Sequence, residues 1–540
     1  MKHRAVKKSL VVALVLLPVV ARGWGDSSTR PLPSAAALES ITPEELRAHV
    51  EFLASDELGG RYVASSSNHI AARYLASQLR RYGYRGGAAD GSFFQKFDIS
   101  VRRLVPDRTR LEITGPAGKK TFSYGRDFIL FGARGTRTLD GEMVFVRHGV
   151  SLPEVNYDDY AKMDVKGKIV VATFSTVPAV TRDGAPLTSR NYPWNQKVAT
   201  AAARGAQAII LLRSPQEGPL PRFGGSGVAE QVSLASDDPT PSSPIVIVFA
   251  GPELAAELCA AAGISPEALS SSDSLPEPKS LGLMARLDVA FENQRYETQN
   301  VIGILDGSDP QRRNEYVVIS AHYDHVQTRN GQIYNGADDD GSGTSAVLEI
   351  AQAFTIGERP KRSILIIFHT AEEVGLLGSR YFVMHPTVPL TAIVANLNID
   401  MIGRSRSPQD TNPANRELSD ANTLYLIGSD KLSRELHELS EQTNQDTEKM
   451  VFDYRYNRED HPERLYYRSD HYNYARNGIP VIFYFTGLHE DYHRPTDDVE
   501  KLDFQKMTRI TRLIFATGWR IANLDHRLKV DGSPPGQRPH

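Results

Sequence analysis

Carboxylate and imidazole side chains gather in four short stretches in the second half of the chain, and a further histidine follows them. The stretches read Ser-Ala-His322-Tyr-Asp324-His325, Gly336-Ala-Asp338-Asp339-Asp340-Gly-Ser-Gly, Ala371-Glu372-Glu373-Val-Gly-Leu and Asn-Ile-Asp400-Met, with His493 later. Nitrogen and oxygen ligands of this kind suit zinc, with cobalt or manganese as substitutes. We therefore predict a metal site whose ligands are His322, Asp339, Glu373, Asp400 and His493.

This ligand set predicts two ions rather than one. One carboxylate must bridge if these side chains are to hold two ions and leave a position open for water. Two-metal sites hold their ions ~3.5–4 Å apart and generate a hydroxide near neutral pH. Asp324 lies two residues beyond His322 and is placed to orient that imidazole without binding the metal itself. The chemistry indicated is metal-assisted hydrolysis.

Each stretch also has an ordinary structural interpretation. Three Asp residues before Gly-Ser-Gly are typical of a solvated loop and helix start, and Glu372-Glu373 of an exposed first helical turn. Asp400 alone is compatible with a buried acid that caps a neighbouring element. Their joint occurrence, each after an apolar run, favours the metal site. An aromatic group from Phe452 to Tyr474 is equally compatible with a side-chain pocket and with core packing.

The elements expected around these residues alternate between strands and helices. Apolar runs predict strands over 316–320, 363–368, 391–399 and 480–485, and amphipathic patterns predict helices over 343–354, 378–384 and 432–443. The ligand stretches follow the strands, and ligands of open α/β sheets bind outside the carboxyl ends of the strands. We therefore expect these strand ends to meet at one edge of a sheet.

The middle of the chain reads as a separate unit. Strand-like runs near 167–173, 208–212 and 244–249 end in no ligand stretch, and Pro- and Ser-rich segments interrupt them. We predict five segments: a signal peptide, two parts of the domain that holds the ligands, an inserted domain between them and a disordered tail. Their bounds are 1–25 for the signal, 41–135 and 289–528 for the two parts of the ligand-holding domain, 136–288 for the insertion and 529–540 for the tail.

Composition limits the classes of function. A chain of 540 residues exceeds one ordinary core, and a net charge of -3 gives no electrostatic case for nucleic acid. The single cysteine, Cys259, excludes an internal disulfide. Basic residues before an apolar run at 10–20 predict a secretory signal cut near Gly23 to Gly25. We expect an exported protein, periplasmic or secreted, without stable membrane insertion; an uncleaved tether is the alternative.

The motifs resemble those of the M28 family of zinc aminopeptidases, and the middle unit resembles the protease-associated (PA) domain found inserted in many such enzymes. The matching motifs are His322-x-Asp324, Gly336-Ala-Asp338-Asp339-Asp340-Gly-Ser-Gly, Ala371-Glu372-Glu373-x-Gly-Leu, Asp400-Met, His493-x-x-x-Asp497 and the early segment Leu53 to Arg61. The resemblance implies an α/β fold with a mixed, mostly parallel sheet flanked by helices, of the zinc-exopeptidase-like (phosphorylase/hydrolase-like) kind, with a smaller inserted α/β PA domain.

The same resemblance implies roles for the site residues. Asp339 bridges two zinc ions, Glu373 and His493 complete the ligands of one ion, and His322 and Asp400 complete those of the other. Glu372 is the general acid/base, and Tyr466, or its neighbour Tyr467, stabilises the oxyanion. The implied substrate is a peptide or aminoacyl compound, and the PA domain covers the cleft. The remaining histidines match no family ligand and are interpreted as structural or surface residues: His325, His369, His461, His471 and His489.

Two other functions remain open from the sequence. One is an acyltransferase like glutaminyl cyclase, which shares the fold and several ligands and uses one zinc. The other is a non-catalytic binding protein like the transferrin-receptor relatives, which keep the fold and lose ligands. The full ligand set and the inserted domain argue against the acyltransferase. The full ligand set and the intact Glu372 argue against the binding protein. The oligomeric state and the preferred side chain are not indicated by the sequence.

Overall fold

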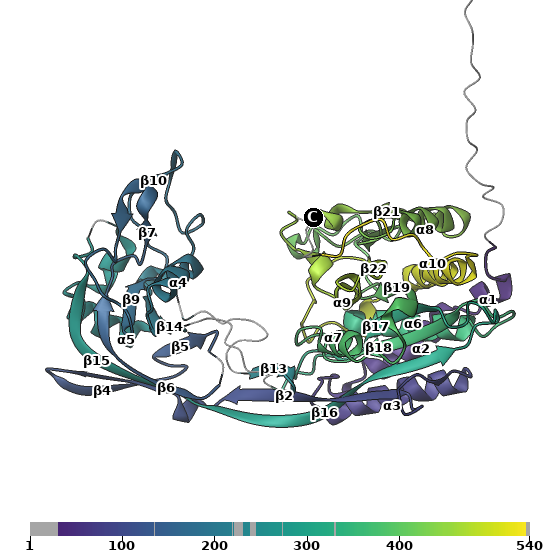
Figure 1. Cartoon of the computed structure of the whole chain (residues 1–540), viewed down its shortest axis with the longest axis horizontal. Coiled ribbons are helices and arrows are strands. Elements are labelled where there is room, and N and C mark those ends of the chain that lie inside the picture. Colours follow the sequence, from purple (N-terminus) through teal and green to yellow (C-terminus); the bar gives the residue numbers. More distant parts are fainter. Residues whose placement is uncertain are drawn as a thin grey trace, which may run out of the picture.

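The computed structural model of the chain describes residues 31–535, except 134, 219, 221–229, 238–244, 273, 329–330 and 459. The predicted signal segment, 1–25, lies outside the described residues. The described chain forms two lobes, each built on its own sheet (Figure 1). Two long antiparallel strands, β2 (Phe94–Leu104) and β16 (Phe291–Leu305), run between the lobes.

The larger lobe holds a ten-stranded sheet in the part of the chain that the structure describes. Its order is β13 (Glu230–Leu234), β2, β16, β18 (Ser363–His369), β17 (Tyr316–His322), β19 (Ile393–Ile399), β22 (Val481–Phe485), β20 (Thr423–Ile427) and β21 (Val451–Asp453), with β1 (Arg85–Gly86) beside β16. The central strands β18, β17, β19 and β22 are parallel, whereas the pairs on either side of them are antiparallel. The predicted mixed α/β fold is confirmed.

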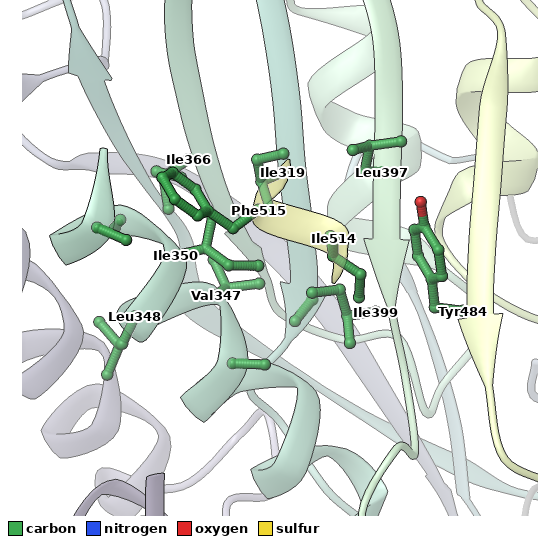
Figure 2. Packing of buried hydrophobic residues seen from close by; sticks show 14 of the residues in the cluster. Ile319, Val347, Leu348, Ile350, Ile366, Leu397, Ile399, Tyr484, Ile514 and Phe515 are labelled. Atoms are coloured by element: carbon green, nitrogen blue, oxygen red, sulfur yellow. The ribbon is translucent and has the colours of Figure 1, made fainter. Parts of the chain in front are cut away.

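Helices cover both faces of the larger sheet. One face packs in a common core with α1 (Ala35–Glu39), α2 (Pro43–Leu53), α3 (Ser66–Arg81), α6 (Gly343–Ala353), α8 (Arg434–Asp446) and α10 (Phe504–Asn523). The other face packs with α7 (Leu377–Met384) and α9 (His471–Ala475). Figure 2 shows Val347 and Ile350 of α6 and Phe515 of α10 against Ile319 of β17. Strands buried on both faces account for the unbroken apolar runs in the sequence.

The smaller lobe holds an eight-stranded sheet. Its order is β4 (Gly118–Ser123), β3 (Arg110–Gly115), β15 (Lys279–Val289), β6 (Arg137–Phe145), β9 (Ile169–Thr173), β12 (Ala208–Leu212), β14 (Val246–Ala250) and β5 (Phe128–Phe131). The helices α4 (Trp194–Ala203) and α5 (Pro252–Ala262) pack against it. Two short hairpins, β7 (Ser151–Leu152) with β8 (Tyr157–Asp158) and β10 (Thr181–Arg182) with β11 (Ala185–Pro186), complete the lobe.

The sheets divide the chain differently from the predicted domains. β3, β4 and β5 lie within the predicted first part of the ligand-holding domain, which ends at residue 135, yet they pair with strands of the smaller lobe. β15 pairs with both β3 and β6, although it lies more than 130 residues after them in the sequence. Local sequence patterns do not reveal such a pairing. Conversely, β13 comes from the middle of the predicted insertion and joins the larger sheet.

Hydrogen bonds hold the residues near both ends of the described chain. Thr42 caps α2 by accepting from the backbone N–H of Glu45, as expected from Thr before Pro at a helix start. Near the C-terminus, Asp531 accepts from the N–H of Arg434 at the start of α8 (3.0 Å), so the beginning of the predicted disordered tail is docked. Among the described residues, no helix is long and apolar enough to cross a membrane.

Candidate metal centre

Four parallel strands bring most of the predicted ligands to one edge of the larger sheet. β17 ends at His322, and Asp400 directly follows β19. β18 ends three residues before Glu372, and the chain leaving β22 reaches His493 after a short loop. Because the strands are parallel, their carboxyl ends meet at the same edge.

The first group of ligands contains His322, Asp339 and Asp400. The Nε2 atom of His322 lies 3.4 Å from Oδ1 of Asp339 and 3.6 Å from Oδ1 of Asp400. All three side chains are buried, and one atom from each lies within reach of a common ion. Asp339 itself comes from the segment Ala337–Ser342, which leads into α6.

The second group shares Asp339 with the first. The other carboxylate oxygen of Asp339, Oδ2, lies 3.1 Å from Nε2 of His493, and Oε2 of Glu373 lies 2.9 Å from the same nitrogen. The two oxygens of Asp339 thus face two different groups of ligands. This is the arrangement expected of a bridging carboxylate.

The polar atoms of the centre fit a metal rather than a hydrogen-bond network. Asp339 Oδ2, Glu373 Oε1 and His493 Nε2 are buried, and none of them is in hydrogen-bond geometry with another described group. Imidazole nitrogens nevertheless lie 2.8 Å from Glu373 Oε1 and 3.1 Å from Asp339 Oδ2. Buried polar atoms are normally hydrogen-bonded, so atoms that converge in this way fit a cation held between them. Burial lowers the pKa of His493, but Glu373 and Asp339 outweigh it and raise that pKa to about 10. The field at the centre therefore favours positive charge.

His325 belongs to this centre although it was not predicted as one of the ligands. Its Nδ1 atom lies 2.8 Å from Oε1 of Glu373 and 3.9 Å from Oδ2 of Asp339, and its side chain is fully buried. His325, Asp339 and Glu373 form a second group able to hold an ion. The interpretation of His325 as a structural or surface histidine does not fit this position. Its place in the loop after β17, three residues from His322, was the available signal.

Asp324 lies beside the His322 imidazole, with its carboxylate 3.8 Å from Nδ1 of His322, and it also contacts the two glutamates. The Nδ1 atom of His322 lies 3.2 Å from the backbone oxygen of Asp324, which leaves Nε2 of His322 toward the ligands. The Asp324 carboxylate accepts from the N–H groups of Glu372 (3.1 Å) and Glu373 (3.4 Å). Burial, together with the nearby Glu373 charge, raises the pKa of Asp324 to about 7. The carboxylate therefore orients the two glutamates.

The loop that carries Asp339 is held by side chains distant in sequence. Oδ2 of Asp497 accepts from the N–H groups of Asp338 and Asp339, each at 3.1 Å. The fully buried guanidinium of Arg61 donates to the backbone oxygens of Tyr323 (2.8 Å) and Gly336 (2.9 Å). The Leu53 to Arg61 segment thus fastens the loops after β17 and before α6 to each other. These contacts fix the Asp339 carboxylate in place.

Glu372 lies beside the ligands and lines the pocket above them. Its Oε2 atom is 3.9 Å from Nε2 of His322. Burial, followed by the charges of Asp400, Glu373 and Asp470, raises the pKa of Glu372 well above its usual value, although His322 opposes the shift. A carboxyl group with a raised pKa can both take up and release a proton near neutral pH.

Tyr466 and Tyr467 do not reach the pocket. Tyr466 is buried in the apolar core under β22, and its ring lies 5.0 Å from the Lys431 ammonium. The tyrosine that lines the pocket is Tyr492, whose ring stacks on His493 with centroids 3.9 Å apart. Adjacency to a ligand was the signal that could have identified Tyr492.

The rest of the pocket is largely apolar. Arg468 lines it, and one of its guanidinium nitrogens donates to the hydroxyl of Tyr492 (3.4 Å). The apolar lining residues are Met401, Leu465, Phe483, Phe485 and Leu488. Most of the aromatic group from Phe452 to Tyr474 packs in or against the cores instead. The pocket thus joins metal ligands, one acid and an apolar wall.

Fold and site together define a metal-dependent hydrolase with an added second lobe. Residues 300–518 match the model of peptidase family M28, and residues 140–256 match the PA domain. Residues 300–518 thus form a region of the M28 peptidase kind, and residues 140–256 form a PA domain.

Two of the similar proteins below align over most of the chain, and one aligns over about a quarter of it. The chain is 25% identical to aminopeptidase YwaD of Bacillus subtilis over 449 residues, which are 81% of this chain and 78% of that protein. It is 38% identical to a probable leucine aminopeptidase 2 of Aspergillus oryzae over 141 residues, 26% of each chain. An aminopeptidase structure from Aneurinibacillus sp. strain AM-1 covers 92% of this chain and 98% of its own, with a TM-score of 0.56 and 18% identity. The last likeness concerns the fold.

Proposed function

We propose that the protein is an exported two-zinc exopeptidase that removes residues from the N-termini of peptides. The observation that carries the proposal is the position of Asp339, whose two oxygens face His322 on one side and His493 on the other. The match to family M28 and relatives named aminopeptidases support the peptide substrate.

The donor set fits two zinc ions. His322, Asp339 and Asp400 would hold one ion, and Asp339, Glu373 and His493 would hold the other. Imidazole and carboxylate donors without thiolates suit zinc. When bound, the ions would supply a Lewis acid and lower the pKa of water.

Glu372 moves the proton in this proposal. Its carboxylate takes a proton from the attacking water and gives it to the nitrogen of the departing amine. The burial that raises its pKa is the physical reason why it can hold that proton between the two steps. Asp324 keeps Glu372 in position by accepting from its backbone N–H.

The pocket lining suggests the substrate. The Tyr492 hydroxyl and the Arg468 guanidinium are the neutral and cationic donors available to the carbonyl oxygen of the scissile bond as negative charge develops there. Met401, Leu465 and Phe483 would receive an apolar N-terminal side chain. We therefore expect leucine and phenylalanine to be preferred over acidic residues.

Zinc analysis and a substrate screen test the proposal together. Purified protein should contain two zinc ions per chain and hydrolyse leucyl and phenylalanyl amides faster than glutamyl amides. One zinc per chain with cyclisation of N-terminal glutamine would favour the cyclase-like alternative. A folded, zinc-loaded protein inert on every peptide would favour the binding-protein alternative.

Export is part of the proposal and rests on the basic and apolar pattern of the first 25 residues. N-terminal sequencing of the protein recovered from cells should find a mature end near residues 23–25. Recovery of the intact N-terminus in the membrane fraction would instead support an uncleaved tether.

A further inference from the structure

A strand from the PA domain is built into the larger sheet. β13 lies in the sequence between β12 and β14 of the smaller lobe, yet it pairs antiparallel with β2, with Leu234 opposite Ile99. It sits where the two lobes join (Figure 1). We call residues 230–237 the β13 arm. Ala235 extends its pairing by donating to the backbone oxygen of Asp98 (2.9 Å).

The arm contacts the segment that carries the two catalytic-site glutamates. Leu234 is fully buried in the same apolar cluster as Ala371 and Leu377, which flank Glu372 and Glu373. Residues 371–377 form a tight turn between β18 and α7, here called the glutamate turn. Beyond it, Nη1 and Nη2 of the Arg380 guanidinium on α7 donate to Asp237, at 2.8 and 2.9 Å. The arm is therefore linked to the turn through a shared apolar cluster and to the following helix by an ion pair.

The glutamate turn needs such support because of its backbone. Ala371 and Leu376 have φ values of 60° and 57°, in the left-handed region that side chains with a Cβ rarely adopt. Within the turn, Leu376 donates to the backbone oxygen of Glu372 and Leu377 to that of Ala371, each at 2.9 Å. Surrounding packing must keep a turn of this kind in one conformation. On one side that packing comes from the arm.

We propose that the β13 arm positions the glutamate turn, so that the PA domain supports the reaction centre directly. Leu234 and Asp237 are positioning residues, and they act through Glu372 and Glu373. The activity part of this inference rests on the proposed peptidase function. The structural part does not, because the order of the turn is measurable without any substrate.

The test compares Leu234→Ala with Leu211→Ala in full-length, zinc-loaded protein. Leu211 is equally buried, lies in β12 of the smaller lobe and is not in the arm. In Leu234→Ala we expect faster amide hydrogen exchange across residues 371–377. We also expect a loss in kcat on the order of 100-fold with little change in KM, because a misplacement of about 1 Å can have that effect. In Leu211→Ala the exchange of the turn and kcat should match the wild type.

A charge exchange keeps the test decisive if Leu234→Ala does not fold. Asp237 and Arg380 are partly exposed, so their variants should fold. Asp237→Arg and Arg380→Asp should each lower kcat and speed exchange of the turn, and the double variant should restore both. Normal exchange and kcat in both single variants, or an effect of Leu234→Ala no larger than that of Leu211→Ala, would overturn the proposal.

The two proposals fail in different ways. A wild type inert on all peptides would remove the proposed function, while the exchange data would still decide the role of the arm. Active wild type with unchanged turn exchange in every arm variant would remove the arm proposal and leave the peptidase.

Discussion

Both lobes bury charged side chains, but the two lobes differ in the hydrogen bonds that these side chains make. In the smaller lobe, the Lys197 ammonium is fully buried and donates to the backbone oxygens of Thr173 (2.8 Å) and Thr176 (2.6 Å). Nearby, Asp159 accepts from the Tyr157 hydroxyl and the N–H of Val150. In the larger lobe, the oxygens and nitrogens of Asp339, Glu373 and His493 face one another, and some of these atoms are not in hydrogen-bond geometry with another described group.

This difference distinguishes a structural cluster of buried charges from a cluster that can bind a metal. Burying a polar group costs free energy unless it is hydrogen-bonded, so the partners of Lys197 and Asp159 make that cluster stable by itself. In the larger lobe, the carboxylates of Asp339 and Glu373 and the imidazoles of His325 and His493 converge instead on common points, where a cation would stabilise them. Burial of charge alone therefore does not identify a functional site. Convergence of several buried metal-binding atoms on one point does.

Among the substitutions that test this comparison, we expect the largest effect from one at Asp339. Asp339→Asn removes the charge shared by both groups of ligands, so we expect fewer than two zinc ions per chain. Activity should fall by at least about 10⁴-fold, the upper end of what one acid or base contributes. Metal analysis and kcat/KM measure both effects. Asp306→Asn, in an exposed ion pair with Arg85, is the control; two tightly bound zinc ions in Asp339→Asn would contradict the bridging role.

Glu372→Gln separates catalysis from metal binding. The amide cannot carry the proton, so kcat should fall by about 10²–10⁴-fold, while zinc content and thermal stability stay near those of the wild type. Glu257→Gln, on the surface of the smaller lobe beside Lys120, is the matched control. Loss of zinc in Glu372→Gln would instead show that this residue is a ligand.

His325→Asn tests the histidine that was not predicted as a metal ligand. Without the imidazole beside Oε1 of Glu373, the affinity for the second zinc should fall about 10–100-fold, as for other residues that orient ligands. Competition with a chelator measures this affinity. His526→Asn, at an exposed site, should behave as the wild type. Unchanged affinity in His325→Asn would assign His325 to packing alone.

Lys197→Met should affect stability and its pH dependence, with little effect on kcat. Burial lowers the pKa of Lys197 to about 7, below the usual 10.5. The amine of Lys197 therefore binds its proton more tightly in the unfolded chain than in the folded chain, and this difference opposes folding at low pH. The opposition disappears as the pH rises from about 7 toward 10.5, because the amine then loses its proton in both states. Lys197 therefore makes stability rise over this window.

Denaturant unfolding at several pH values measures this contribution. Lys197→Met should lose the rise, whereas Lys168→Met, in a partly exposed pair with Glu142, should keep it. Leaving the carbonyls of Thr173 and Thr176 without their donor should also cost about 1–3 kcal/mol. A strong loss of zinc or of kcat in Lys197→Met would show that the two clusters are not as separate as their contacts indicate.

Much of the larger lobe follows from local sequence patterns. Strands predicted at 316–320 and 363–368 appear as β17 and β18, and the helix predicted at 343–354 appears as α6. These elements are strongly apolar and buried, so local preference and burial agree. The boundary at residue 135 differs because β3 pairs with β15 and β5 pairs with β14, and both partners lie far along the chain.

At the site, the sequence alone determined the ligand types and their order, because ligands that follow parallel strands must meet at one edge. Only the tertiary structure decided which neighbours join them. His325 turns toward Glu373, Tyr492 rather than Tyr466 reaches the pocket, and the β13 arm packs against the glutamate turn. Those outcomes depend on loop direction and on contacts between distant segments. No periodicity in the chain encodes them.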